Sequence, residues 1–197
     1  MKTNLLIAAA LMFAAPVAAQ SLHSEGEAFL QAVRDLDANR AIPYLEAPGS
    51  RYASFKGVDG ETALHIVTRA KEVRWVATLL HHGADPNDTD DKGDTPLVIA
   101  TQLDFVDGAE RLIDKGADVN LGNRWGETPL IIAVQLRKTR MVKLLLEKGA
   151  DPDKPDRSTG LSARDHASRD TRNPEILQMI ESVKPQGKLT FGPIIQR

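Results

Sequence analysis

The tripeptide Gly-Ala-Asp occurs three times in the chain, at Gly83, Gly116 and Gly149, and successive copies begin 33 residues apart. A fixed period of this length is typical of repeat proteins, in which one small unit cannot bury its apolar face alone and packs against the next unit. The sequence therefore predicts a row of stacked units. Such a row favours a surface for partners over an enclosed pocket for chemistry.

The three copies agree over longer segments. Each contains Gly-x-Thr followed by an apolar stretch, at residues 60–67, 93–100 and 126–133. A second apolar block follows at the three- and four-residue spacing of one helical face. The glycine of Gly-Ala-Asp then ends this second helix, because glycine readily takes the left-handed backbone conformation. One unit is predicted to be a turn, two helices and a long loop.

The start of the first helix in each copy carries its own signal. Thr62, Thr95 and Thr128 stand where a helix N-cap belongs. Pro96 and Pro129 follow two of them directly, and proline suits the first helical turn because its missing N–H is unpaired there in any case. Since a cap contributes about 1 kcal/mol, we expect packing between units to stabilise the stack more than the caps do.

These segments resemble the ankyrin repeat. The family pattern Asp-x-x-Gly-x-Thr-Pro-Leu-His-x-Ala is matched at residues 90–100 with valine for histidine, at 123–133 with asparagine for aspartate and isoleucine for histidine, and at 57–67 with His65 present and alanine for proline. The family's closing Gly-Ala-Asp-Val-Asn is present at residues 116–120, with proline variants in the other copies. The resemblance implies an all-α solenoid of helix-turn-helix units joined by hairpin-like loops, with protein binding as its function.

Weaker copies flank the three clear ones. Residues 26–33 align with 60–67, and residues 160–167 follow 126–133 at a spacing of 34. Arg164 replaces Leu130 in the last copy, which fits an end repeat because a long charged side chain can cover apolar surface while its head stays in water. We expect about five units in an ankyrin repeat domain over residues 20–184, with bounds near 24–56, 57–89, 90–122, 123–156 and 157–184.

The N-terminus reads as a secretory signal peptide over residues 1–19. Lys2 supplies the positive charge, residues 5–15 form an apolar run, and small residues precede Gln20. Cleavage after Ala19 is the favoured interpretation, and an uncleaved anchor is the alternative. We therefore expect a periplasmic or secreted protein that is not stably inserted in a membrane. Overall the chain resembles small signal-bearing bacterial ankyrin proteins, some of which are thought to support periplasmic enzymes under stress.

The C-terminal tail, residues 185–197, contains prolines and glycines that prevent a continuing helix. Its apolar residues Leu189, Phe191, Ile194 and Ile195 either fold onto the last repeat or form a short ligand for a partner.

Composition narrows the class of function. The chain has no cysteine, which leaves no disulfide and no thiol chemistry. Of 25 basic and 27 acidic residues, residues 1–19 remove only Lys2, so the remainder carries a net charge of −3 with neutral histidines. This balance offers no basic footprint for nucleic acid. We expect a monomer that binds another protein.

No catalytic or metal motif is found among the histidines. His65 occupies the histidine position of the family pattern, where the resemblance implies a structural bond to the threonine. His81 and His82 close a second helix, and a metal-dependent enzyme built around them is the remaining alternative. The aspartates of residues 85–94 lack the spacing and closing glutamate of a calcium loop. We expect no cofactor and no enzymatic activity.

The resemblance also implies where a partner binds, namely at the hairpin tips and the exposed positions of the first helices. Carried over by position, these residues are Val58, Asp59, Glu61, Arg69, Asp91, Lys92, Asp94, Gln102, Arg124, Trp125, Glu127 and Gln135. Trp125 is the favoured anchor, because tryptophan dominates interface hot spots. Its alternative is to lie flat on a hairpin. Tyr52 and Phe55 are secondary contacts, and Trp75 is expected to pack between helices.

Gly108 departs from the pattern, since it replaces the large residues Trp75 and Met141 of neighbouring copies. We expect either a neighbouring side chain, Trp75 or Met141, or a local groove at this point. For function, a binding module that supports an enzyme is favoured. An immunity or inhibitor protein that blocks a toxin or hydrolase is the alternative with the same surface.

Overall fold

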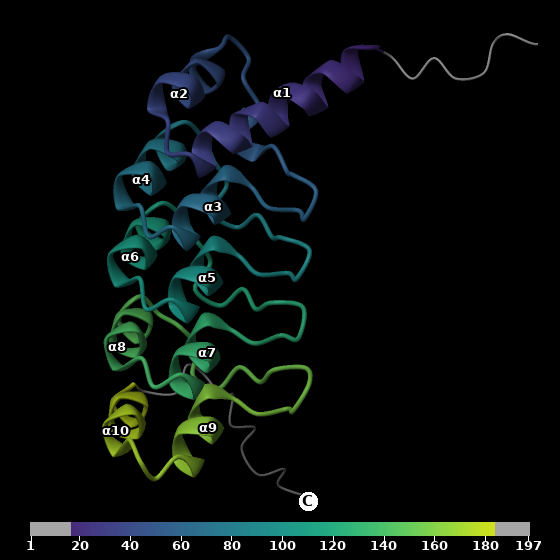
Figure 1. Cartoon of the computed structure of the whole chain (residues 1–197). Coiled ribbons are helices and arrows are strands. Elements are labelled where there is room, and N and C mark those ends of the chain that lie inside the picture. Colours follow the sequence, from purple (N-terminus) through teal and green to yellow (C-terminus); the bar gives the residue numbers. More distant parts are fainter. Residues whose placement is uncertain (1–16, 184–197) are drawn as a thin grey trace, which may run out of the picture.

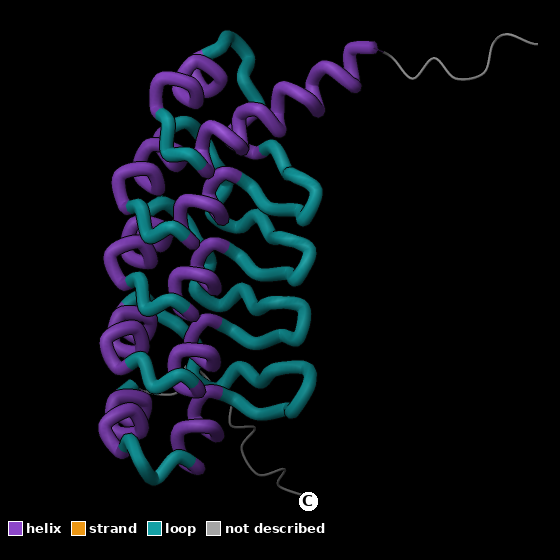
Figure 2. The backbone as a smooth tube through the Cα atoms, viewed as in Figure 1, coloured by secondary structure: helices purple, strands orange, loops and turns teal. Residues whose placement is uncertain are grey.

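The computed structural model describes the backbone of residues 17–183 and the side chains of residues 23–183. In this part of the chain the protein contains ten α-helices, one short 3-10 helix and no strand (Figures 1 and 2). The expected all-α repeat architecture is therefore confirmed. Most of the expected signal peptide and the whole tail at residues 185–197 lie outside the described residues. The elements are α1 (Val17–Arg34), α2 (Ala38–Glu46), η1 (Tyr52–Ser54), α3 (Ala63–Arg69), α4 (Val73–His81), α5 (Pro96–Gln102), α6 (Val106–Asp114), α7 (Pro129–Gln135), α8 (Thr139–Glu147), α9 (Ala163–Arg169) and α10 (Pro174–Ser182).

The helices form antiparallel pairs that stack in one direction (Figure 1). The first helices α1, α3, α5, α7 and α9 make an inner column, and the second helices α2, α4, α6, α8 and α10 make an outer column. Hairpin-like loops project from the inner column on the side away from the outer helices, and together they form a third layer (Figure 2). This layer places the loop tips of neighbouring repeats side by side.

The inner helices begin at the predicted caps. Thr95 Oγ1 accepts a hydrogen bond from the Val98 N–H at 3.2 Å, and Thr128 Oγ1 accepts one from the Ile131 N–H at 3.3 Å. In α9, Ser162 and Asp165 bond each other's backbone and side chain as a reciprocal capping box. The same local device therefore starts these inner helices, as the sequence predicted.

Two kinds of turn end the helices. Gly83, Gly116 and Gly149 end α4, α6 and α8 with φ values of 83°, 96° and 87°, as expected for left-handed C-terminal glycines. The turns between inner and outer helices also take a left-handed residue, but there it is not glycine: Lys71, Asp104 and Arg137 have φ values of 58°, 54° and 54°. The sequence gives no glycine signal at these three turns, so their conformation was not predicted.

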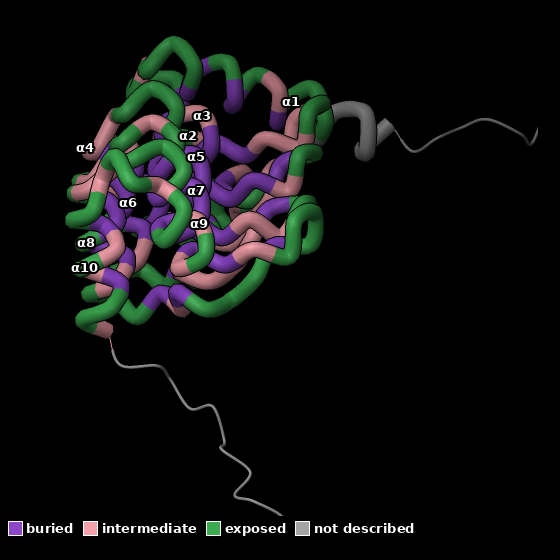
Figure 3. The backbone as a smooth tube through the Cα atoms, turned by 90° about the horizontal axis from the view of Figure 1, so that it is seen from below, coloured by how far each residue is buried: buried purple, intermediate pink, exposed green. Residues whose placement is uncertain are grey.

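The core runs through the middle of the stack, between the columns (Figure 3). Leu64, Leu97 and Leu130 of the inner helices are fully buried, and so are Leu79, Leu112 and Leu145 of the outer helices. Burying one leucine side chain contributes roughly 1.5–3 kcal/mol. Since α3, α5 and α7 each pack against the next inner helix, these leucines stabilise the joints between repeats.

Two asparagines join the long loops of successive repeats. Asn87 donates its Nδ2 to the Gly116 carbonyl at 2.9 Å and accepts the Asp118 N–H at 2.8 Å. Asn120, its counterpart one repeat later, accepts the Asp151 N–H at 2.8 Å. The asparagine at the end of the Gly-Ala-Asp segment therefore satisfies backbone groups of the following repeat.

The first unit differs from the expected repeat. Gly26 does not open a turn but lies inside the long helix α1, where a Cβ atom would come within 2.3 Å of the Phe55 ring. Tyr52 packs against Phe29 and donates its hydroxyl to Glu25 at 2.5 Å. Tyr52 and Phe55 are therefore partly buried packing residues, and their role as secondary partner contacts stays a prediction. These two aromatic side chains pack against α1 at this end of the stack.

The place expected to be loose at Gly108 is filled by Phe105. A Cβ atom on Gly108 would lie 2.0 Å from Cε1 of the Phe105 ring, which itself is buried. A neighbouring side chain therefore fills the space, as one of the two expectations had it, but the residue is Phe105 and not Trp75 or Met141. Trp75 is partly buried against the core, as expected.

Candidate partner-binding surface

The hairpin tips are joined into one row by backbone hydrogen bonds. The Asp91 N–H donates to the Asp59 carbonyl at 3.1 Å, and the Arg157 N–H donates to the Trp125 carbonyl at 2.8 Å. Between these two pairs of tips, the Arg124 N–H donates to the Lys92 carbonyl at 3.4 Å. The structure therefore brings together the six predicted tip residues on neighbouring loops, and all six are exposed: Val58, Asp59, Asp91, Lys92, Arg124 and Trp125.

A buried aspartate or asparagine holds three of the hairpins from inside. Asp90 Oδ1 accepts the backbone N–H groups of Lys92 and Asp94, each at 2.9 Å. One repeat later, Asn123 Oδ1 accepts the two backbone N–H groups at the equivalent positions. Asp156 is the third. Burial by itself would raise the pKa of the Asp156 carboxyl, but hydrogen bonds from Thr159 and Ser158 outweigh burial and lower this pKa to about 2.

Trp125 is held by its backbone while its side chain is exposed. Its N–H donates to Asn123 Oδ1 at 3.1 Å and its carbonyl accepts from Arg157, so the tip is fixed on both sides. Its exposed fraction is 49%. The ring–ring contacts found in residues 23–183 do not include Trp125. An exposed aromatic on an ordered tip is a candidate anchor for a partner.

The remaining predicted residues of the inner helices and their entry loops differ in availability. Arg69 donates to Glu61 at 2.5 Å and lies 3.9 Å from Asp90, so these two carboxylates largely compensate its positive charge. Glu127 accepts from the Asn123 side chain at 3.0 Å. Gln102 and Gln135 are exposed at the C-terminal ends of α5 and α7.

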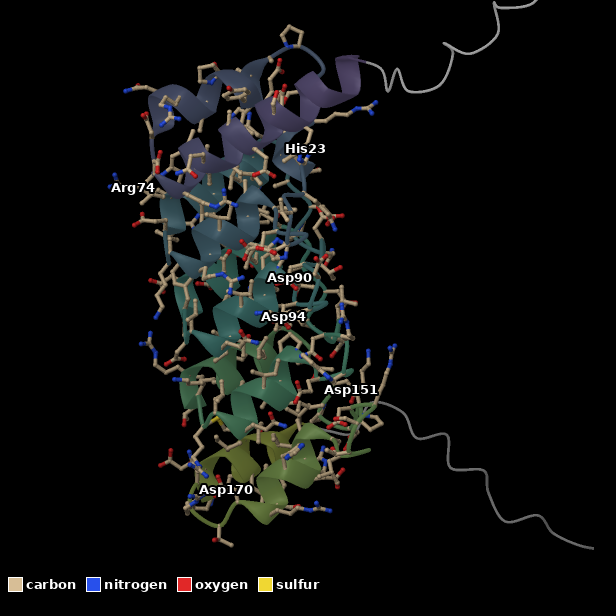
Figure 4. The ribbon with its side chains drawn as sticks, turned by 45° about the vertical axis from the view of Figure 1, so that its right-hand side comes forward. His23, Arg74, Asp90, Asp94, Asp151 and Asp170 are labelled. Carbon is tan, nitrogen blue, oxygen red and sulfur yellow. The ribbon has the colours of Figure 1, made fainter. Side chains whose placement is uncertain are left out.

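Asp94 is the one predicted contact that the structure places inside. Its exposed fraction is 7%, which leaves no carboxylate for a partner, so this prediction was wrong. Burial and the nearby negative charge of Asp90 both raise the pKa of Asp94. Figure 4 shows the two aspartates close together beside the hairpin row. The backbone of Asp94 also joins its hairpin to the neighbouring repeat, because the Asp94 carbonyl bonds His65.

His65 has the structural role that its position implied. Its Nδ1 accepts the Thr62 N–H at 3.1 Å, and its Nε2 donates to the Asp94 carbonyl at 3.0 Å. Burial lowers the pKa of the imidazole, which keeps the ring neutral. The histidine therefore belongs to the scaffold that positions the tips.

His81 and His82 stack edge to face with ring centroids 5.5 Å apart. Across residues 23–183, no three histidine or acidic side chains gather in a geometry that could hold a metal ion. Of the described helices, none combines the length and the apolar character that crossing a membrane requires.

One feature of the surface was missed by sequence reasoning. A groove with a volume of about 380 Å³ lies where the ends of α7 and α9 meet, and it is lined by Val134, Gln135, Arg137, His166, Arg169, Asp170, Thr171 and Arg172. Arg137 and Asp170 are 33 residues apart, one repeat period, and their side chains bond at 2.5 Å. The period itself was the signal that could have found this pair.

Comparison with known proteins adds one finding. A family model for ankyrin repeats matches three times, over residues 11–123, 64–156 and 106–182. Together these matches span residues 11–182, which is most of the sequence. No curated protein matches the chain.

Proposed function

This chain belongs to the ankyrin repeat family, whose repeats are general protein–protein interaction modules, and on that premise we propose that it is a non-catalytic module that holds a partner protein against its hairpin tips and inner helices. The observation that carries the proposal is Trp125, an exposed aromatic ring on a tip whose backbone is bonded on both sides. A fixed tip loses little conformational entropy on binding. A partner that covers this ring gains apolar burial at small cost.

The position of the ring in the row supports a broad contact. Arg124 precedes Trp125 on the same tip, and the exposed Asp91 and Lys92 lie on the next tip towards the N-terminus. Arginine and tryptophan are enriched at interface hot spots, and surrounding polar residues exclude water from them. We infer that a partner centres on Trp125 and Arg124 and extends over the neighbouring tips.

The proposed place of action is the periplasm or the exterior of the cell, because residues 1–19 carry the charge, apolar run and small residues of a secretory signal. The proposed purpose is support of an enzyme in that compartment under stress. An inhibitor of a toxin or hydrolase would use the same surface, and it differs in what binding does to the partner's activity.

The experiment is capture from a periplasmic extract with the wild-type protein, Trp125→Ala and the control His81→Ala. His81 is exposed on the outer helix α4, away from the tips. We expect one protein to be retained by the wild type and the control and lost by Trp125→Ala, with helix content unchanged. Equal retention by all three would contradict the proposal. Abolished activity of the captured enzyme would assign the inhibitor role instead.

A further inference from the structure

The groove between the ends of α7 and α9 has a charge that the hairpin tips do not share. Three arginines line it, Arg137, Arg169 and Arg172, against a single carboxylate, Asp170. Asp170 lies near the C-terminal end of the stack in Figure 4, far from the Asp90–Asp94 pair. Although the whole chain has a formal charge of −2, this place is locally basic.

The three arginines differ in the hydrogen bonds that their side chains make. Arg137 Nε donates to Asp170 Oδ2 at 2.5 Å, and Arg172 Nε donates to Asp170 Oδ1 at 3.2 Å. Arg169 has no hydrogen bond or ion pair from its side chain to any part of the chain that the structure describes. The nearest acidic residue on its own helix, Asp165, uses its carboxylate to accept the N–H and hydroxyl of Ser162. The charge of Arg169 acts on Asp165 at longer range and helps to lower the pKa of that carboxyl, but the guanidinium N–H groups of Arg169 remain free to bind a ligand in the groove.

Asp170 shows what kind of group the groove accommodates. Its carboxylate bridges two guanidinium groups, one from the turn after α7 and one from the turn after α9. A planar carboxylate matches the fork of an arginine, because its two oxygens can accept two parallel N–H hydrogen bonds. Arg169 offers a third fork beside this bridge, and Val134 and Thr171 supply an apolar and a polar wall.

We propose that this groove binds the carboxylate of a glutamate or aspartate in an acidic segment of the partner protein, with Arg169 as its main contact and Asp170 as an internal competitor. The inference rests on the proposed function, since it names the chemistry of the partner. A volume of about 380 Å³ is larger than one side chain, so two or three residues of an extended acidic segment fit. The groove thus sets charge specificity, while Trp125 supplies apolar contact.

The two roles predict opposite effects of substitution. Arg169→Gln removes the unpaired guanidinium and weakens binding. Asp170→Asn removes the competing charge, frees Arg137 and Arg172 for the ligand, and strengthens binding. Because exposed ion pairs in water are weak, each effect is expected to be roughly three- to fivefold.

The test is a titration of the ¹⁵N-labelled protein with a capped tetraglutamate peptide, followed by amide chemical shifts at about 0.15 M salt, where charges beyond roughly 8 Å are screened. Capped tetraglutamine and inorganic phosphate are the reference probes. Arg74→Gln and Asp107→Asn make the same charge changes on the exposed faces of α4 and α6 and serve as matched controls. Arg172→Gln is an additional variant that keeps the Arg137–Asp170 bond.

We expect tetraglutamate to shift amides from Gln135 to Arg137 and from His166 to Arg172, tetraglutamine to shift none, and both controls to bind within twofold of the wild type. Three results would overturn the proposal: shifts spread over the whole surface, phosphate binding as tightly as tetraglutamate, or Arg74→Gln weakening binding as much as Arg169→Gln. Should Asp170→Asn unfold, weaker binding by Arg172→Gln carries the same test, and unchanged binding contradicts it. Since the peptide replaces the partner, this titration can fail while capture through Trp125 succeeds.

Discussion

His65 and Asp94 are joined across a repeat boundary, because the imidazole Nε2 donates to the Asp94 carbonyl oxygen at 3.0 Å. The Thr62 N–H donates to Nδ1 of the same ring at 3.1 Å, which fixes the proton on Nε2. One neutral side chain therefore caps α3 and holds the next hairpin in place. The tip that carries Asp91 and Lys92 is positioned from the core and not from the surface.

We predict that His65→Val lowers the free energy of unfolding by about 1–3 kcal/mol, because the Thr62 N–H and the Asp94 carbonyl lose a buried partner. Urea unfolding at pH 7.5 measures this. The control His81→Ala changes an exposed histidine and should stay within about 0.5 kcal/mol of the wild type.

The same pair predicts a pH dependence. Burial lowers the pKa of His65, so the stability from its neutral form is complete above the ordinary histidine pKa of about 6.5 and is lost as the pH falls below it. The loss of stability between pH 7 and pH 5 should therefore be smaller in His65→Val than in the wild type. An equal loss in both proteins would show that His65 does not contribute to the pH dependence of stability.

Replacing Gly108 by alanine is expected to lower the stability of the protein, although helix propensity alone predicts a gain. Gly108→Ala adds a good helix former to α6, yet its Cβ meets the Phe105 ring, and overpacking of this kind typically costs about 1–3 kcal/mol. Thermal unfolding is the measurement. In the Phe105→Ala background the same glycine substitution should be harmless or stabilising, and a loss there as large as in the wild type would contradict the packing explanation.

Asp156 is expected to make the stability of the protein depend on pH in a second, acidic range. Its pKa of about 2 lies below the ordinary aspartate value near 3.9, so the stability from its ionised form is complete above about pH 4 and declines as the pH falls towards 2. Asp156→Asn should therefore be less stable than the wild type at neutral pH. The difference should narrow in acid unfolding experiments between pH 4 and pH 2.5, and a constant difference would argue against a lowered pKa.

The N-terminus supplies a prediction about export. Cleavage after Ala19 removes Val17, Ala18 and Ala19, which are the first residues of α1, and leaves the helix from Gln20 onward. Edman sequencing or intact mass of the protein isolated from the periplasm should begin at Gln20. A retained Met1, or a protein found only in the cytoplasm, would contradict the proposed location.

The features that sequence predicted are those with a local cause. A threonine cap or a left-handed glycine is decided within a few residues, which is why the starts of α5 and α7 and the ends of α4, α6 and α8 were predicted correctly. The left-handed conformations of Lys71 and Asp104 were not predicted, because neither residue is a glycine and the paired helices on either side of each turn constrain its backbone. The residues of a short sequence segment do not predict such a tertiary effect.

The errors in the site have the same origin. Asp94 has the sequence position of an exposed acidic residue, but His65 and Asp90 draw its backbone inward. The groove was missed because Arg137 and Asp170 meet only when repeats stack. Exposure of a charged residue depends on its neighbour in the next repeat, which a single copy of the pattern does not contain.

The central claim is that a partner protein rests on the hairpin row, and site-specific photo-crosslinking tests it most directly. A photoreactive phenylalanine analogue is placed at Trp125, at Asp91 or, as a control on the outer column, at His81, and the cells are irradiated. The account predicts the same crosslinked partner from positions 125 and 91 and none from position 81. Crosslinks from position 81 alone, or equally from all three positions, would show that the partner binds elsewhere.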